Sequence, residues 1–248
     1  MRVTLIEMHS IRDAIRSLYL SKRNWTPELE EYISDLVDRC TGKHGRPRLD
    51  FVENEEKEEF TNLVNKVFKY GRKHTTLLRF IDISVIVEGL HRGATDDFDS
   101  HAKRLDNRII RSSTRLATYN TEEMSDWYKD KIIPTDIMTA YLGIPMPDEV
   151  MMEGAPYVKA TNGYILKGME NNNDVKRGLY MLSLPMTFTF KVNLAELAHI
   201  YRLRGSKEHG AVGTAAPELQ EMIETLMDQV QSWYPQLTRG YFLDVEEV

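Results

Sequence analysis

One short segment restricts the possible folds of this chain more than any other feature. The run Phe80-Ile81-Asp82-Ile83-Ser84-Val85-Ile86-Val87 is rich in β-forming residues and mostly apolar, as is typical of a strand buried inside a sheet. Amphipathic segments with the spacing of α-helices stand before and after it. The sequence therefore predicts a mixed α/β or α+β protein.

The expected elements divide the chain into a helical N-terminal part and a mixed remainder. Before the buried run we expect a strand at Met1–Glu7, helices at Ile11–Leu20, from Thr26-Pro27 onward and from Glu53 to Gly71, and a basic Gly/Pro loop at Gly42–Arg48. After it we expect helical segments at Gly89–Leu105, Pro134–Leu142, from Asn171–Asp174 onward, at Asn193–Arg204 and at Ala216–Tyr234, a hairpin at Tyr157–Leu166 with an Asn-Gly turn, and a strand at Thr187–Val192. We expect a single domain over residues 1–248, whose helical N-terminal part covers about residues 10–72.

Composition narrows the class of partner. The 248 residues include 38 acidic and 32 basic side chains, a net charge of -6, which argues against direct nucleic-acid binding. No apolar run approaches the roughly 18 residues that cross a bilayer, so no membrane partner is expected. Cys40 is the only cysteine, so an intrachain disulfide is impossible and a reducing cytoplasm is the expected location.

Common catalytic signatures are missing from the sequence. It contains no Gly-x-Ser-x-Gly, no Gly-x-x-x-x-Gly-Lys, no Gly-x-Gly-x-x-Gly and no His-Glu-x-x-His. Asp96, Asp97, Asp99 and His101 carry groups that can bind a metal, but one acidic cluster on a charged segment is more typical of a solvated face. We therefore predict no metal site.

Two segments carry candidate ligand-binding residues. Arg108–Arg115 holds three arginines and three hydroxyl residues, which suit a phosphate or carboxylate, although an exposed basic strand has the same composition. In the helix Asn193–Arg204, eleven steps make about three turns, so Asn193 and Arg204 bracket one apolar stripe and can reach a common cleft. The alternative is that Arg204 caps the helix C-terminus beside Gly205.

The order of these pieces resembles the flavin-dependent thymidylate synthases. That family has a His-x-Ser-x-x-Glu-His segment, a strand, a Gly-[Val/Ile]-Ser-Arg step and a Ser-x-x-Glu-x-Ser-x-Arg-Tyr element. The corresponding pieces here are His74-Thr75-Thr76, Phe80–Val87, Gly89-Leu90-His91-Arg92 and Ser113-Thr114-Arg115-Leu116. The family's Arg-His-Arg signature is replaced by Asp99-Ser100-His101, and its glutamate before Ser-x-Arg aligns near Arg111.

The C-terminal half continues the resemblance. The pieces that match the family's Leu-Pro, Asn-[Leu/Ala]-x-x-Leu-x-His and Leu-Arg pattern are Leu184-Pro185, Asn193-Leu194, Leu197, His199 and Leu203-Arg204. Ala216-Pro217-Glu218-Leu219 stands where the family has Ala-Gln-x-Glu-Ile. The resemblance implies a central, mostly antiparallel sheet flanked by helices, and a homotetramer whose active sites combine several subunits.

The resemblance also implies an activity and roles for individual residues. Methylene would pass from methylenetetrahydrofolate to dUMP, with FAD supplying the hydride and NADPH reducing the flavin, so the protein would be a methyltransferase. Arg204 would hold the pyrimidine as the catalytic residue, and the other substrate-binding residues would be Arg111, Ser112, Ser113 and Arg115. The residues expected near the flavin are His74, Arg92, His101, Asn193 and His199.

Because the charges differ from the family signature, two other interpretations remain. The chain could be a relative that modifies another pyrimidine nucleotide, for example by hydroxymethylation of dUMP or dCMP. It could also be a non-catalytic protein that binds nucleotide or a protein partner on the same scaffold. A relative of the first kind could be encoded by a virus that modifies its bases and could act in the host cytoplasm.

Overall fold

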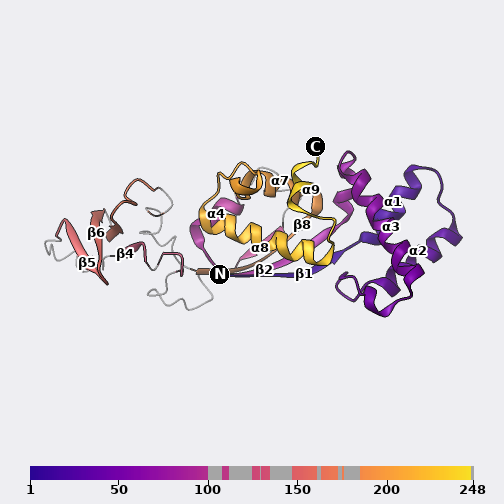
Figure 1. Cartoon of the computed structure of the whole chain (residues 1–248), viewed down its shortest axis with the longest axis horizontal. Coiled ribbons are helices and arrows are strands. Elements are labelled where there is room, and N and C mark those ends of the chain that lie inside the picture. Colours follow the sequence, from indigo (N-terminus) through magenta and orange to yellow (C-terminus); the bar gives the residue numbers. More distant parts are fainter. Residues whose placement is uncertain are drawn as a thin grey trace.

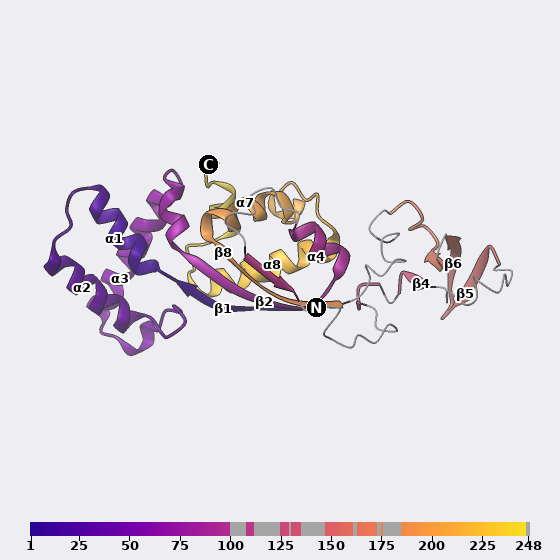
Figure 2. The ribbon, with the colours of Figure 1, turned by 180° about the vertical axis from the view of Figure 1, so that it is seen from behind.

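The computed structural model describes residues 1–99, 108–111, 125–128, 130–134, 147–160, 163–172, 175 and 185–246. These residues form two antiparallel four-stranded sheets and a set of helices (Figures 1 and 2). The strands are β1 (Arg2–His9), β2 (Asp82–His91), β3 (Arg108–Arg111), β4 (Ile132–Pro134), β5 (Glu149–Met152), β6 (Ala155–Ala160), β7 (Gly163–Leu166) and β8 (Pro185–Asn193). The helices are α1 (Ile11–Ser21), α2 (Pro27–Cys40), α3 (Asn54–Gly71), α4 (Arg92–Asp99), α7 (Leu194–Arg204), α8 (Pro217–Trp233) and α9 (Arg239–Leu243), with short 3-10 helices η1 (Leu49–Phe51), η2 (Thr75–Phe80) and η5 (Lys207–His209).

The larger sheet has the order β1-β2-β8-β3, with β2 hydrogen-bonded along its length to β1 and β8. Alternate residues of β2, Ile83, Val85 and Val87, are fully buried, whereas Ile86 between them is 36% exposed. The buried side chains lie under α4, α7 and α8, which cover one face of the sheet (Figure 1). This alternation is the pattern of an antiparallel sheet with one covered face.

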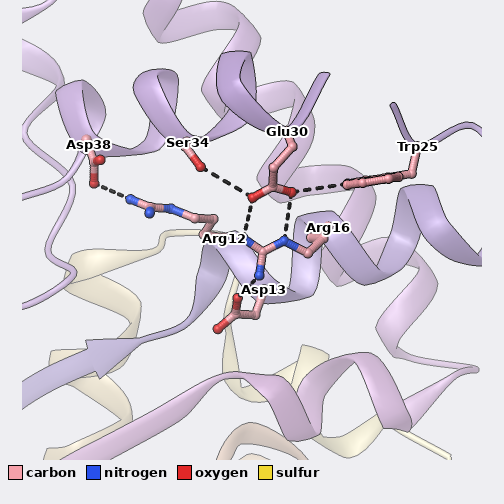
Figure 3. Close-up of polar contacts among 7 residues, drawn as sticks. All are labelled: Arg12, Asp13, Arg16, Trp25, Glu30, Ser34 and Asp38. Atoms are coloured by element: carbon pink, nitrogen blue, oxygen red, sulfur yellow. Dashed lines mark hydrogen bonds and ion pairs between the residues drawn. The ribbon is translucent and has the colours of Figure 1, made fainter. Parts of the chain in front are cut away.

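The N-terminal helices pack together at one end of this sheet (Figure 1). Helix α2 begins as the sequence predicts, because the Thr26 hydroxyl accepts a hydrogen bond from the Leu29 amide at 3.2 Å and Pro27 is the first helical residue. Arg16 of α1 clamps α2 through a two-pronged ion pair with Glu30 (Figure 3). A single apolar core runs from these helices through the sheet to α8 and α9.

The second sheet has the order β4-β7-β6-β5 and lies beyond the other end of the larger sheet (Figure 2). Its apolar cluster is small and comprises Tyr128, Ile132, Ile165 and Val175. Tyr128 also touches His91 at the end of β2, so this cluster meets the larger sheet there.

The expected fold class is confirmed, but several boundaries were wrong. The central strand starts at Asp82, because Phe80 ends η2 with 42% exposure, and it continues through Gly89 to His91 instead of giving way to a helix. Gly89 has a φ of +85° at an irregularity in the β2–β8 register, which glycine tolerates and which lets the strand go on.

Two further expectations were wrong in the second half of the chain. Pro134 ends β4 instead of opening a helix. The hairpin over Tyr157–Leu166 is confirmed as the antiparallel pair β6–β7, but the expected Asn-Gly turn is wrong, because Gly163 pairs with Ala160 as the first residue of β7. The expected helices over 135–142 and from 171–174 onward lie almost wholly outside the described residues. In the described part of the chain, no helix has the length and apolar character needed to cross a bilayer.

Candidate functional site

Four elements meet where β2 ends. His91 is the last residue of β2, Arg92 opens α4, Arg204 closes α7 and Glu218 lies in the first turn of α8. Side-chain contacts join β2 to α8 and α4 to α7. This end of the sheet therefore collects polar groups from segments more than one hundred positions apart in the sequence.

Arg204 is held by the buried stripe of its own helix and reaches across to α4. Leu197 and Ile200 of that stripe are fully buried. The Arg204 side chain is 19% exposed, its Nη2 lies 3.5 Å from Asp97 Oδ1, and its Nη1 lies 3.5 Å from the Thr214 hydroxyl. Arg204 Nε is buried and has no hydrogen-bond acceptor among the described residues. Among the described residues, the contacts of the guanidinium are with Asp97 and Thr214 and not with the last carbonyls of α7, which argues against the helix cap.

Arg92 stands beside this arrangement at the start of α4. Its Nε lies 3.9 Å from Asp96 Oδ2 one turn later, and its side chain is 40% exposed. Asp96 and Asp97 of α4 therefore each pair with an arginine, Arg92 and Arg204 respectively. Within the described residues, no three metal-binding side chains are grouped closely enough to hold a metal ion.

A buried hydrogen-bond network joins the end of β2 to the first turn of α8. A Glu218 carboxylate oxygen contacts His91 Nδ1 and accepts the His91 amide at 3.0 Å, and the other accepts the Ser125 hydroxyl at 2.7 Å. His91, Ser125 and Glu218 are each 2% exposed. Burial raises the pKa of Glu218, but hydrogen bonds from His91 and Ser125 lower it more, so the pKa lies below its ordinary value.

Sequence reasoning missed this network. Glu218 was read only within a matching motif, and His91 only as part of the step before Arg92. The two residues are 127 positions apart, and no local pattern connects them. The usable signal was Glu218 itself, because a carboxylate among apolar residues at the start of an amphipathic helix needs a buried partner.

Two of the predicted flavin-side residues lie at the opposite end of β2. Asn193 pairs with Asp82, the first residue of β2, and its side-chain oxygen caps α7 by accepting the Glu196 amide at 2.9 Å. His74 is exposed and immediately precedes η2, which packs against α7. Because a strand rises about 3.3 Å per residue, the ten residues of β2 separate this end from Arg92 by roughly 30 Å.

Of the predicted set, Arg92 and Arg204 both pair with aspartates of α4, Asp96 and Asp97 respectively. His199 is half-buried in the middle of α7. Arg111 ends β3, where its backbone pairs with Phe188 of β8. Three predicted substrate-binding residues and one flavin-side residue lie outside the described residues: Ser112, Ser113, Arg115 and His101. The expected convergence of Arg115 with Arg204 stays a prediction.

Comparison with known proteins covers nearly the whole chain. Residues 23–236 match the family model described as thymidylate synthase complementing protein. Thymidylate synthase X from Helicobacter pylori, solved with FAD and dUMP, aligns over 98% of this chain and 100% of its own, with 12% identity and a TM-score of 0.49. A UMP/dUMP methylase, PolB from Streptomyces cacaoi bound with 5-Br dUMP, aligns over 97% and 94%, with 10% identity and a TM-score of 0.49. No curated protein matches the chain significantly. The family match includes β2, α4, α7 and α8, which carry the candidate site.

Proposed function

The chain belongs to the thymidylate synthase complementing protein family, and from this premise we propose that it is a flavin-dependent thymidylate synthase. It converts dUMP to dTMP by transferring a methylene group from methylenetetrahydrofolate. FAD supplies the hydride when bound and reduced, and NADPH reduces it. The membership confirms the family resemblance of the sequence motifs, and the reaction is the proposal built on it.

The observation that carries the proposal is the Arg204 guanidinium, which is 19% exposed and is held toward α4 by Asp97. A pyrimidine presents carbonyl oxygens along one edge, and a fixed guanidinium beside them stabilises negative charge that develops on the ring. The Asp97 contact holds the guanidinium toward α4 without using Nε. Arg204 therefore binds and polarises the uracil of dUMP.

The residues present fit an anionic flavin cofactor. Arg92 is a partly exposed cation at the start of α4, where backbone N–H groups also favour a phosphate. His74 is exposed, and the Asn193 cap uses only the oxygen of that side chain, so its amide nitrogen takes no part in the cap. Arg92, His74 and Asn193 would hold FAD, the first from one end of β2 and the other two from the opposite end.

Because those ends are far apart in one chain, a complete site combines two copies. The Arg92 and Arg204 end of one protomer meets the His74 and Asn193 end of another. A symmetric oligomer, which the family resemblance implies to be a tetramer, repeats this junction in every subunit.

A second candidate function is favoured by the aspartates on α4. Asp97 and Asp96 compete with any bound anion for Arg204 and Arg92, respectively. Such a site suits a pyrimidine nucleotide other than dUMP, for example dCMP, whose exocyclic amine donates a hydrogen bond to a carboxylate. This reading keeps the fold and changes the nucleotide.

Titration calorimetry of the purified oligomer with dUMP and dCMP tests the proposal, together with its absorption spectrum. We expect flavin absorption and dUMP binding. Arg204→Ala should weaken dUMP binding at least about tenfold, since a charged hydrogen bond is worth about 1.5–3 kcal/mol. Lys57→Ala, an exposed change on α3, is the control. A preference for dCMP supports the second candidate, and equal dUMP affinity in Arg204→Ala removes Arg204 from the site.

A further inference from the structure

A hollow lies away from Arg204, where the loop after α2 meets β1 and the end of α8. Its volume is about 450 Å³. We call it the basic hollow, and the lining residues that matter here are Lys43, Arg46, Arg48, Asp50, Phe51 and Trp233. None of them belongs to the set that the family resemblance assigns to nucleotide or flavin. The volume is in the range of small-molecule sites.

The loop that supplies the cations is a folded hairpin. Residues 41 and 47 form an antiparallel bridge. The Gly42 amide donates to the Arg46 carbonyl at 2.8 Å, and the Arg48 amide donates to the Cys40 carbonyl at 2.8 Å. The cations therefore project from a backbone that is hydrogen-bonded within itself.

The hairpin is also fixed to the body of the protein. The Met8 amide of β1 donates to the His44 carbonyl at 2.9 Å, and the Tyr234 hydroxyl donates to the Gly45 carbonyl at 2.9 Å. Gly45 has a φ of +77°, and a Cβ there would lie 1.7 Å from the Met8 carbonyl oxygen. Such close docking leaves little backbone entropy to lose when a ligand binds, which favours affinity.

The charge of the basic hollow contrasts with the rest of the chain. Lys43, Arg46 and Arg48 are exposed, and none forms an ion pair with a carboxylate among the described residues, although the chain carries a net charge of -6. Arg46 lies over the Trp233 ring at 5.9 Å from its centroid. Asp50 is the one carboxylate in the lining. Three unpaired cations against one carboxylate suit a ligand with several negative charges.

An aromatic ring stands beside these cations. Phe51 is 87% exposed, the most exposed large apolar side chain among the described residues. A ring left in water next to basic side chains is a stacking surface for a flat aromatic group that carries phosphates. Cations and ring together match the two halves of a nucleotide.

We propose that the basic hollow binds a nucleoside polyphosphate. Its phosphates lie among Lys43, Arg46 and Arg48, and its base stacks on Phe51. The site is separate from the one at Arg204, and it needs neither flavin nor turnover, so it stands whether or not the proposed function is correct.

Titration calorimetry of the purified oligomer at low salt, with dUMP present in excess, tests this site with ATP as the probe. We expect ATP to bind, more weakly as salt rises, and inorganic tripolyphosphate to bind less tightly than ATP. Lys43→Ala and Arg48→Ala should each weaken ATP binding by about fivefold or more, which is the loss of a partly exposed, charged hydrogen bond. Phe51→Ala should weaken ATP and leave tripolyphosphate unchanged.

Two controls locate the binding. Lys66→Ala, an exposed change on α3, and Arg204→Ala should both bind ATP as the wild type does. The proposal is overturned if ATP gives no heat, if Lys43→Ala and Arg48→Ala bind it normally, or if Arg204→Ala loses it. It is equally overturned if a single-stranded oligonucleotide binds at these residues and ATP does not.

Discussion

At the scale of single residues, the buried polar groups are concentrated at one place. Among the described residues, the buried polar or charged side chains are Thr75, His91, Thr95, Ser125, Asn193, Glu196 and Glu218. Four of these seven gather where β2 ends: the Thr95 hydroxyl donates to the His91 carbonyl, and Ser125 and His91 converge on Glu218. Burying polar groups costs stability unless they are mutually satisfied, so this network positions the end of β2 and the start of α4.

Glu218→Gln tests that network. The amide keeps the shape but loses the charge and one acceptor oxygen, so either His91 or Ser125 loses its partner in the core. We expect a loss of about 2–4 kcal/mol in the free energy of unfolding, measured by urea denaturation at pH 7. Glu221→Gln on the exposed side of α8 is the matched control and should change it by less than about 0.5 kcal/mol.

The difference in stability between the wild type and Glu218→Gln should also depend on pH. The pKa of Glu218 is lowered in the folded state, so its contribution is present above the ordinary carboxyl pKa of 4.5 and is lost as the pH falls below it. The stability gap between wild type and Glu218→Gln should therefore narrow in acid. A gap that widens as the pH falls would show that folding raises the pKa of Glu218.

At the scale of elements, the α1–α2 contact includes an ion pair, Arg16–Glu30, that the pH can switch. The hydrogen bond from Arg16 lowers the pKa of Glu30 to about 2 (Figure 3). Glu30→Gln should reduce stability at neutral pH by no more than about 1 kcal/mol, because both side chains are partly exposed. The loss of stability caused by Glu30→Gln should be greatest above pH 4.5 and should disappear as the pH approaches 2. Thermal unfolding against pH measures it, with Glu31→Gln at an exposed position of the same helix as the control.

The hairpin after α2 offers a second test at this scale. Gly45→Ala places a methyl group against the Met8 carbonyl at a positive φ, so the hairpin must move away from β1. Hydrogen exchange should show lost protection of the Met8 amide, whose acceptor is the His44 carbonyl. Gly154→Ala has a similar φ of +82° but open space around it, and Met8 should stay protected there. Equal protection of Met8 in both variants would contradict the close docking of the hairpin.

The sequence predicted those elements whose own periodicity is long enough to identify them. Helices α1, α2, α3, α7 and α8 and strand β8 lie where the apolar spacing placed them, because each buries one stripe or face of the core. The strands β4 and β5 went unrecognised because three or four residues carry no usable alternation. In the site, Arg204 was found through its helix, whereas its contact with Asp97 and the pairing of His91 with Glu218 depend on tertiary packing.

At the scale of the whole molecule, the proposed activity requires more than one chain. The His74 end of the larger sheet is separated from Arg92 by the ten residues of β2 and from Arg204 by the eleven residues of α7. An ordinary small-molecule pocket of 300–1,000 Å³ is only about 10 Å across, so one chain does not bring both ends to one ligand. A twofold arrangement does, because it sets unlike ends of two copies against each other.

Mixing two inactive variants tests this arrangement. His74→Ala and Arg204→Ala should each be nearly inactive alone, because every site then carries a lesion. When they are unfolded together and reassembled in equal amounts, a site draws its two ends from different copies. About a quarter of the sites then receive both intact ends, so thymidylate formation should return to about a quarter of the wild-type rate.

A second mixture identifies which ends meet. A mixture of Arg92→Ala and Arg204→Ala places both substitutions at the same end of the chain. Every site then contains one of the two substitutions, so thymidylate formation should stay absent. Mass spectrometry of the intact oligomers confirms that the copies have mixed. If mixed oligomers of His74→Ala and Arg204→Ala form and remain inactive, the two ends act within one chain. If His74→Ala is active on its own, His74 lies outside the site. Measuring flavin content separates these cases, because a His74 outside the site leaves the flavin of His74→Ala at the wild-type level.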